Sequence, residues 1–183
     1  MRIHHPARPR HYGFTLIESM ATIVILATLS MSASFLIITA VDGYIEAMTR
    51  AQLHSELSIA MDRIVRELRQ IPLDPNAATP VPDITLIQSD FISWNAASAY
   101  ALSYLAPPDL RLQAPVMGDL LNDVTSFTIA AYDEDNALLV LPLGDVPSEA
   151  ARRIEITIAL TRTGVTESLR TRVYLRSMIT GGA

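Results

Sequence analysis

Glu18 is the residue whose position most clearly points to chemistry, because it directly precedes a long uncharged run. Ser19–Val41 holds no charged side chain, and as a helix it would span about 35 Å, enough for a bilayer core of about 30 Å. A carboxylate beside hydrocarbon is costly unless it finds a partner, so Glu18 is a candidate for pairing with another charged group. The residues leave one alternative open, in which the helix dipole favours this acid or its side chain reaches toward the lipid headgroups.

A second grouping of reactive residue types is His54 with Ser55 and Ser58. A catalytic triad needs side chains that converge in a cleft from separate elements, whereas these three belong to one expected helix. The chain also has no cysteine, which excludes disulfides, thiolate nucleophiles and cysteine-based zinc sites. We therefore expect no catalytic residue, no cofactor and no small-molecule substrate, and a protein that is not an enzyme.

Asp133–Asn136 is the best cluster of oxygen ligands in the chain. Such oxygens could hold calcium, but the segment lacks the glycine and the distal glutamate of an EF-hand loop. Its composition is typical of a solvated turn. We therefore expect a turn here and no metal site.

Arg170, Arg172 and Arg176 alternate along one segment near the C-terminus. They could meet an acidic partner or extracellular DNA, or they could form a solvated face that blocks edge-to-edge aggregation. The net charge of the chain is −5, and without the three arginines of residues 1–13 it is −8. An acidic body of this kind does not favour general binding to nucleic acid.

A long N-terminal helix must position Glu18. No proline occurs between Pro9 and Pro72, and beyond the uncharged run the apolar residues recur at steps of three and four, as on an amphipathic helix. The sequence predicts one helix from about Phe14 to Ile71, on the order of 87 Å long, with a membrane-spanning segment at about 19–41. The apolar stripe is Leu57, Met61, Ile64, Leu68 and Ile71, and the expected i,i+4 ion pairs are Glu46–Arg50 and Asp62–Arg66.

A proline-rich connector, residues 72–83, separates this helix from a region in which the apolar residues recur with a period of two. Residues 84–183 predict an antiparallel sheet with one apolar face on the amphipathic half of the helix and one face in water. The fold class is therefore α+β. The expected strands are TLIQSDFISW, YALSYLA up to a turn at Pro107–Asp109, DVTSFTIAAYD, RRIEITIAL and SLRTRVYLR, and LLVLPL is a short apolar run.

The alternation also predicts which strand residues face the core. The last two strands form a hairpin through TRTGV. The expected inward residues are Phe127, Ile129 and Ala131, then Ile154, Ile156, Ile158 and Leu160, and then Leu169, Thr171, Val173 and Leu175. The expected outward residues are Arg153, Glu155 and Thr157, and then Arg170, Arg172, Tyr174 and Arg176.

The N-terminal motif resembles the signature of type IV prepilins. It consists of a basic leader ending at Gly13, then Phe14-Thr15-Leu16-Ile17-Glu18, and then an apolar helix of membrane length. The resemblance implies that a prepilin peptidase cuts off the leader, residues 1–13, between Gly13 and Phe14. It further implies that Phe14 becomes N-methylated and that Glu18 assists filament assembly.

Three later stretches are similar to minor pilins of the PilW kind, to J-type minor pseudopilins of type II secretion, and to the O-type pilin of mannose-sensitive haemagglutinin pili. They are MDRIVRELRQ, LLNDVTSFTIAAYDED and RRIEITIALTRT with SLRTRVYLRS. The implied partners are other major and minor pilin subunits and the bacterial inner membrane. Because basic residues precede the helix, the N-terminus is expected in the cytoplasm and the C-terminal domain in the periplasm.

A conventional signal peptide is the rival interpretation of the N-terminus. Ser32-Ala33-Ser34 supplies small residues for cleavage after a basic start and an apolar stretch. The mature chain would then be a secreted periplasmic binding protein or enzyme that starts near Phe35. Two features count against this interpretation: apolar sequence continues beyond the cleavage point as FLIITAV, and Glu18 interrupts the start of the apolar stretch.

Overall fold

The computed structural model describes residues 15–78, 80–96, 98–106, 108–114 and 116–175. The expected leader, Gly13, Phe14, Pro107 and Arg176 lie outside these described residues. The chain divides into two compact units, residues 1–45 and 46–183, and each is described by itself.

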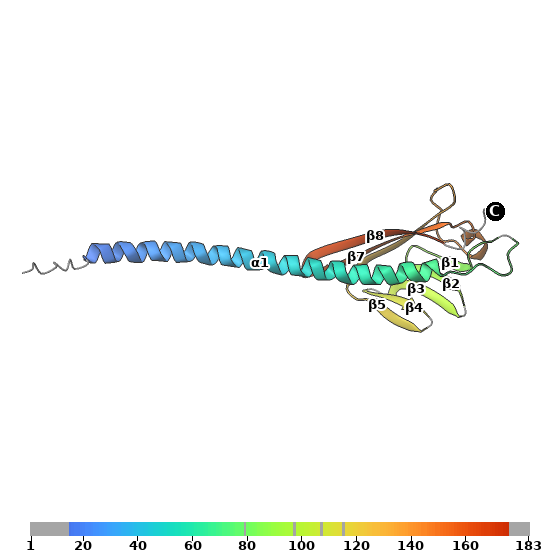
Figure 1. Ribbon diagram of the computed structural model, residues 1–183, viewed down its shortest axis with the longest axis horizontal. Coiled ribbons are helices and arrows are strands. Elements are labelled where there is room, and N and C mark those ends of the chain that lie inside the picture. Colours follow the sequence, from blue (N-terminus) through green and yellow to red (C-terminus); the bar gives the residue numbers. More distant parts are fainter. Residues whose placement is uncertain (1–14, 79, 97, 107, 115, 176–183) are drawn as a thin grey trace, which may run out of the picture. The chain divides into compact units, whose positions relative to one another are not determined.

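Helix α1, Leu16–Arg69, confirms the predicted long helix to within a few residues at each end (Figure 1). Its last turn is tightened, because the N–H of Gln70 donates to the carbonyl oxygen of Glu67 at 3.0 Å. Pro72 follows shortly after and cannot continue a helix, since it has no N–H to donate.

In the first unit, α1 carries exposed apolar side chains on all sides. It is long and apolar enough to cross a membrane. Several hydroxyl groups in this part donate to carbonyl oxygens three or four residues earlier, at 2.9–3.0 Å, as do those of Thr22, Thr28, Ser32, Ser34 and Thr39. These hydroxyl groups therefore do not depend on water for a hydrogen-bond partner.

In the second unit, α1 buries one stripe of its surface. All five residues of the predicted stripe are buried, which confirms the amphipathic pattern. Leu53 and Ala60 extend the stripe, and both belong to the same hydrophobic core as the buried strand residues. Packing of this stripe, rather than helix propensity, holds the second part of α1 in place.

Five antiparallel strands form the first sheet in chain order. Alternate residues such as Ile92, Leu102 and Leu110 are fully buried in the core. The strands are β1 (Ile84–Ile87), β2 (Phe91–Asn95), β3 (Ala99–Ala106), β4 (Asp109–Gln113) and β5 (Met117–Leu121).

The predicted single strand TLIQSDFISW is wrong, because this stretch forms β1, a turn and β2. Ser89 and Asp90 are turn-forming residues, and the N–H of Gln88 donates across the turn to the carbonyl oxygen of Phe91 at 2.7 Å. The predicted strand list also lacked β4 and β5. Strand β5 carries little sequence signal, since Met117, its glycine and its aspartate are all exposed and no alternation appears.

Three antiparallel strands form the second sheet, in the order β6 (Val124–Tyr132), β7 (Arg153–Arg162) and β8 (Val165–Tyr174), and Figure 1 shows β7 beside β8. The predicted hairpin is confirmed, with Arg162 opposite Val165. The two turn residues, Thr163 and Gly164, have φ values of 51° and 83°, as a type I′ turn requires. The inward residues predicted for β6 and β7 are buried, and those of β8 are buried or half-buried.

The prediction of a single sheet is wrong, because β5 and β6 do not pair. Asp123, with a φ of 60°, turns the chain between them. Side-chain and backbone hydrogen bonds join the two sheets instead: the Tyr104 hydroxyl donates to the carbonyl oxygen of Val124 at 2.7 Å. The N–H of Ile129 likewise donates to the carbonyl oxygen of Ser89 at 2.8 Å.

Two connecting segments lie outside the named strands. The short apolar run LLVLPL makes isolated bridges at Leu138 and Leu143, and its proline cannot donate to a ladder. The segment leads into the short helix α2, Asp145–Ser148. The proline-rich connector is closed by a hydrogen bond from the Asp83 N–H to the carbonyl oxygen of Pro72 at 2.9 Å. The fold class is confirmed as α+β, with a long N-terminal helix whose second part packs on antiparallel sheets.

Candidate functional site

Thr15 and Glu18 organise the start of α1. The Thr15 hydroxyl oxygen accepts the backbone N–H of Glu18 at 3.3 Å, and the Thr15 carbonyl oxygen accepts the N–H of Ser19 at 3.1 Å. Thr15 is therefore the N-cap residue, and Glu18 occupies the third position of the helix. The positive end of the helix dipole favours a carboxylate at this position.

The Glu18 carboxylate is exposed and has no ion pair among the described residues. The side chains beside it, Leu16, Ile17 and Met20, are large, apolar and exposed. The structure thus presents one negative charge at the end of a long apolar surface. A positively charged group outside the described residues could pair with it.

Thr15 is a helix-capping residue that the sequence interpretation missed. Thr15-Leu16-Ile17-Glu18 follows the capping-box pattern, in which Ser or Thr precedes Glu by three residues at a helix start. That pattern could have identified the cap. The cap satisfies a backbone N–H that would otherwise lack a partner at the first turn.

On the outer face of the three-stranded sheet, Glu155 lies between two arginines of β8. Its carboxylate oxygens are 2.7 Å from Nη2 of Arg170 and 2.8 Å from Nη2 of Arg172. Glu155 faces outward as predicted, yet it is only 8% exposed because these side chains cover it. The Arg170 guanidinium lowers the pKa of the Glu155 carboxyl most strongly, and Arg172 lowers it further. Partial burial acts in the opposite direction, but the pKa of Glu155 still lies below its ordinary value.

The predicted arginine row is therefore mostly occupied within the protein. Besides binding Glu155, Arg172 lies over the ring of Tyr132 at 4.2 Å, and Arg153 lies over the ring of Tyr174 at 4.9 Å. Arg153 and Arg172 also donate to the side-chain oxygen of Asn136, both at 2.9 Å. The third predicted member of the row, Arg176, lies outside the described residues.

Asp133–Asn136 forms a turn at the end of β6. The Asp133 carboxylate accepts the N–H of Ala137 at 2.7 Å, and Asn136 adopts a φ of 64°. The side-chain oxygens of Asp133 and Asn136 thus already accept hydrogen bonds from the protein, the first from the N–H of Ala137 and the second from two arginines. The side chains of Glu134 and Asp135 are exposed and point to no partner among the described residues.

His54, Ser55 and Ser58 do not form a catalytic arrangement. His54 and Ser55 are exposed on α1, and within the described part of the chain none of the three hydrogen-bonds to another.

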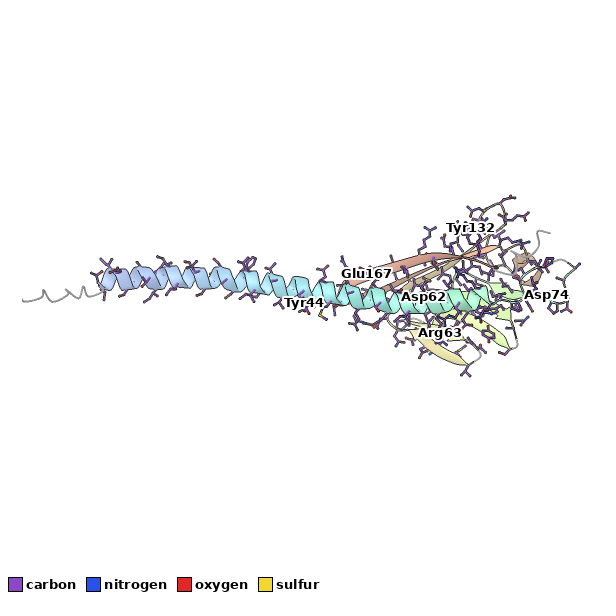
Figure 2. The ribbon with its side chains drawn as sticks, viewed as in Figure 1. Tyr44, Asp62, Arg63, Asp74, Tyr132 and Glu167 are labelled. Atoms are coloured by element: carbon purple, nitrogen blue, oxygen red, sulfur yellow. The ribbon has the colours of Figure 1, made fainter. Side chains whose placement is uncertain are left out.

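Ion pairs tie the second part of α1 to the sheets. The Arg162 guanidinium binds both carboxylate oxygens of Glu56, at 3.1 and 3.2 Å, and also Asp123 at 3.1 Å. Arg50 forms the predicted pair with Glu46 at 3.2 Å and a second pair with Glu167 on β8 at 3.0 Å. Figure 2 marks Glu167 beside the middle of α1. The predicted Asp62–Arg66 ion pair is wrong: no such pair lies within 4.0 Å among the described residues.

Comparison with known proteins identifies one region. Residues 8–34 match the model of the prokaryotic N-terminal methylation motif. This stretch contains Gly13, Phe14 and Glu18 and extends into the apolar part of α1. A search of the curated proteins finds no significant match.

Proposed function

We propose that this chain, a type IV prepilin-like protein by its methylation motif, is a minor pilin or pseudopilin, a non-enzymatic subunit of a type IV pilus-like or type II secretion filament. A prepilin peptidase cuts between Gly13 and Phe14, and Phe14 is then N-methylated. The observation that carries the proposal is the motif at residues 8–34, continued by a helix whose first part is apolar on all sides.

Before assembly, the apolar part of α1 anchors the protein in the inner membrane. The leader arginines keep residues 1–13 in the cytoplasm, which sends the sheet domain to the periplasm. Apolar surface of this extent needs hydrocarbon or neighbouring helices to cover it. When the subunit is extracted into a filament, neighbouring helices replace the hydrocarbon around this surface.

Glu18 sets the axial position of the subunit in the filament. Cleavage at Gly13 gives Phe14 a positively charged amine, which can pair with Glu18 of a neighbouring subunit. In a helix bundle without water this attraction is strong, and a misplaced subunit would leave both charges unpaired. Two observations support this role: the Thr15 cap places Glu18 in the first turn, and the carboxylate has no ion pair among the described residues.

Mass analysis of the mature N-terminus tests the processing. We expect a chain that begins with N-methylated Phe14 in cells that contain a prepilin peptidase, and the uncut chain in cells that lack it. A mature start near Phe35 would contradict the proposal and support a secreted protein with a conventional signal peptide.

The variant Glu18→Ala tests the assembly role. We expect normal cleavage and methylation but about tenfold less incorporation into filaments, since a tenfold effect needs only about 1.4 kcal/mol. Glu46→Ala is the matched control, because it removes a carboxylate from the same helix at a position paired with Arg50. Equal incorporation of the Glu18 and Glu46 variants would rule out the pairing role of Glu18.

A further inference from the structure

Strand β8 carries a row of backbone hydrogen-bonding groups that have no partner among the described residues. It is the last strand of its sheet, and it pairs with β7 along its whole length without a register shift. The two-residue turn and the bond from the Leu175 N–H to the carbonyl oxygen of Arg152 at 3.1 Å fix which groups face β7. The N–H and carbonyl groups of the alternate residues face away from β7, and these residues are Thr166, Ser168, Arg170, Arg172 and Tyr174.

The other edges of the two sheets are interrupted or already bonded. Strand β1 has a register shift, and its Ile87 exchanges two hydrogen bonds with Leu143 at 2.9 Å. Strand β5 is short, contains a glycine and pairs with β4 across a register shift. Strand β6 also has a register shift, and the N–H of Ile129 donates to the carbonyl oxygen of Ser89 at 2.8 Å. Such irregularities hinder the addition of a further strand, so β8 is the edge best shaped to accept one.

The two faces of β8 offer an added strand different side chains. On the core face, Val165 and Leu169 pack against the hydrophobic core but are only partly buried. Apolar side chains of a neighbouring strand would cover them. On the outer face, Arg170 keeps 63% of its side chain exposed while it binds Glu155. A carboxylate beside Arg170 on an added strand would form a cross-strand ion pair.

The outer face of β8 keeps a positive charge after its ion pairs are counted. Arg170 and Arg172 share the single carboxylate of Glu155, so these three residues sum to one positive charge. Arg172 turns toward β6, since it donates to the side-chain oxygen of Asn136 and lies over the ring of Tyr132. The acids of the turn after β6 follow the strand at the opposite edge of this sheet. Arg170 is therefore the arginine that an added strand would meet.

The same arginines disfavour a second copy of the chain as the added strand. If two copies of β8 paired edge to edge in an antiparallel way, the residues with outward-facing groups would lie opposite one another. In the register with the longest overlap, Arg170 would lie directly opposite Arg170 of the other copy. Like charges at directly opposite positions destabilise a pair of strands. The added strand must therefore have a different sequence, with an acidic residue on this face.

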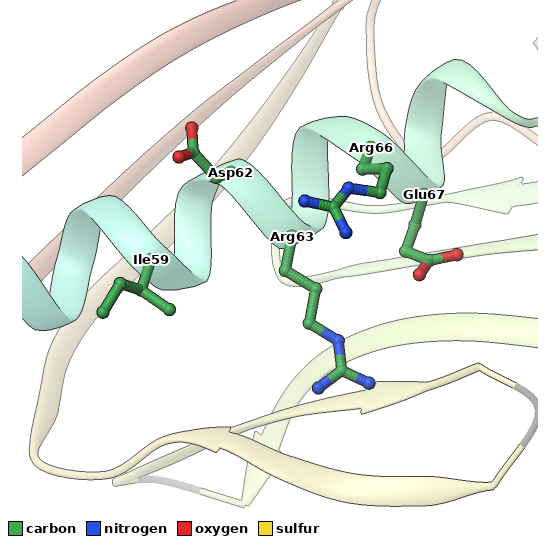
Figure 3. Close-up of a pocket in the computed structure, with 5 residues that line it drawn as sticks. All are labelled: Ile59, Asp62, Arg63, Arg66 and Glu67. Carbon is green, nitrogen blue, oxygen red and sulfur yellow. The ribbon is translucent and has the colours of Figure 1, made fainter.

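The hollow along the last turns of α1 makes no such selection. Two acids, Asp62 and Glu67, and two arginines, Arg63 and Arg66, line this hollow. Figure 3 shows Asp62 and Arg63 pointing to different sides of the helix. These charges balance, so the hollow favours neither an acidic nor a basic partner. Strand β8 combines two signals that the hollow lacks, a continuous row of backbone groups and an unbalanced charge.

We propose that β8 binds an extended segment of a different filament subunit, which joins the three-stranded sheet as a fourth strand. Backbone hydrogen bonds to the outward-facing groups of β8 hold the segment. Its apolar side chains cover Val165 and Leu169, and an acidic side chain on its other face pairs with Arg170. The inference rests on the proposed function for the origin of this segment, because a minor subunit has neighbours of other sequences.

A synthetic strand tests the edge on the purified full-length chain in detergent. The probe is a peptide of about ten residues in which valine and glutamate alternate, and the control peptide carries arginine in place of glutamate. With about 1 mM probe and a Kd of about 0.1 mM, hydrogen exchange at the outward-facing N–H groups of β8 should become about tenfold slower. The control peptide should bind about three- to tenfold more weakly. Unchanged exchange at these groups, or equal slowing by both peptides, would overturn the inference.

The chain without peptide tests a second copy as the occupant. The outward-facing N–H groups of β8 should then exchange at rates that do not depend on the concentration of the chain. Slower exchange at higher concentration would show that a second copy occupies the edge, and this result would refute the proposal.

The variant Ser168→Pro tests the edge in cells that assemble the filament. It removes one outward-facing N–H group and places a ring where the added strand would lie, and β8 tolerates it because this N–H group does not bond to β7. Ser168→Ala is the matched control, since it keeps the N–H group. We expect about tenfold less incorporation into filaments for the proline variant than for the alanine variant.

Unfolding followed by the fluorescence of the buried Trp94 shows whether both variants fold as the wild type does. Thr166→Pro and Thr166→Ala form a second matched pair for the case that Ser168→Pro does not fold. The N–H group of Thr166 also faces away from β7, so the same difference in incorporation is expected for this pair.

The outcomes separate this inference from the proposed function. N-terminal mass analysis of the same samples shows whether the chain starts at Phe14. A chain that starts near Phe35 would contradict the proposed function, and the peptide experiment then decides separately whether β8 accepts a strand. A chain that starts at Phe14, with equal incorporation of the proline and alanine variants, would overturn the docking inference alone.

Discussion

The two parts of α1 use similar apolar residues but end in different surroundings. In the first unit Leu29 is 61% exposed, and in the second unit Leu57 is fully buried against the sheets. Both leucines belong to one uninterrupted helix. In the second unit the chain supplies its own cover for the apolar side chains, whereas in the first unit another molecule or a membrane must supply it.

The hydrogen bonding of polar groups follows the same division. In the first unit the hydroxyl groups of residues such as Thr28 and Ser32 bind carbonyl oxygens of the same helix. In the second unit the charged groups Glu56 and Arg50 bind strand residues far away in the sequence. The first part of α1 can therefore change its surroundings without losing internal hydrogen bonds, but the second part cannot.

The largest expected effect comes from truncating the buried stripe. Leu57→Ala should destabilise the second unit by about 2–5 kcal/mol, because it leaves a cavity in the core. Denaturant unfolding in detergent can be followed by the fluorescence of Trp94, the single tryptophan, which is buried. Leu36→Ala is the matched control and should leave the transition unchanged, since Leu36 is exposed. Equal shifts of the unfolding transition for the two variants would contradict the conclusion that only the second part of α1 is buried in the core.

The converse variant places a charge in the first part of α1. Leu29→Arg should weaken membrane insertion by about 2.5–3.5 kcal/mol and leave unfolding of the second unit unchanged. The fraction of chain that alkaline washing releases from membranes measures the effect. Gln52→Arg, at an exposed position of the second part, should not change that fraction. Retention of the Leu29 variant at the wild-type level would show that this segment does not lie in the membrane.

A smaller effect is expected at Glu155, where the second unit covers a charge with its own arginines. Glu155→Gln should cost about 1 kcal/mol at neutral pH, because the ion pairs are partly open to water. Since the pKa of Glu155 is lowered in the folded state, its contribution is complete above the ordinary glutamate pKa of about 4.3. It is lost as the pH falls through the folded value. Wild type should therefore lose more stability than the variant between about pH 5 and pH 3, and parallel pH curves would contradict this.

The smallest effect is expected for the exposed pairs of Arg50. Its side chain is 58% exposed, so Arg50→Gln should lower the free energy of unfolding by about 0.5 kcal/mol or less. Added salt should reduce the difference further, because it screens exposed charges. A loss comparable to that of Leu57→Ala would mean that ion pairs, rather than the buried stripe, hold α1 on the sheets.

Local patterns in the sequence predicted a large part of this fold. The helix, its buried stripe from Leu57 to Ile71 and the β7–β8 hairpin follow from periodicity and from Gly164 at the turn. The position of Glu18 before the apolar run also follows from the sequence, and so does its match to the methylation motif. Thr15 could have been recognised as the cap from the same local pattern.

The errors concern contacts between residues far apart in the chain. TLIQSDFISW has the composition of one strand, and only the pairing of β1 with β2 shows that it folds back. Asp62 and Arg66 have the spacing of an ion pair but form none among the described residues. Glu56 and Arg162 do form an ion pair, although they lie far apart in the sequence of the second unit.

The sequence by itself determined the apolar anchor, the amphipathic stripe and the alternation of the last strands, because each depends on residues within a few positions of one another. Tertiary structure alone decided that the strands divide into two sheets, that Glu155 is covered by Arg170 and Arg172, and that Arg63 and Arg66 form no ion pair among the described residues. The physical reason is that these features depend on which surfaces pack together, and packing joins side chains without regard to their distance along the chain.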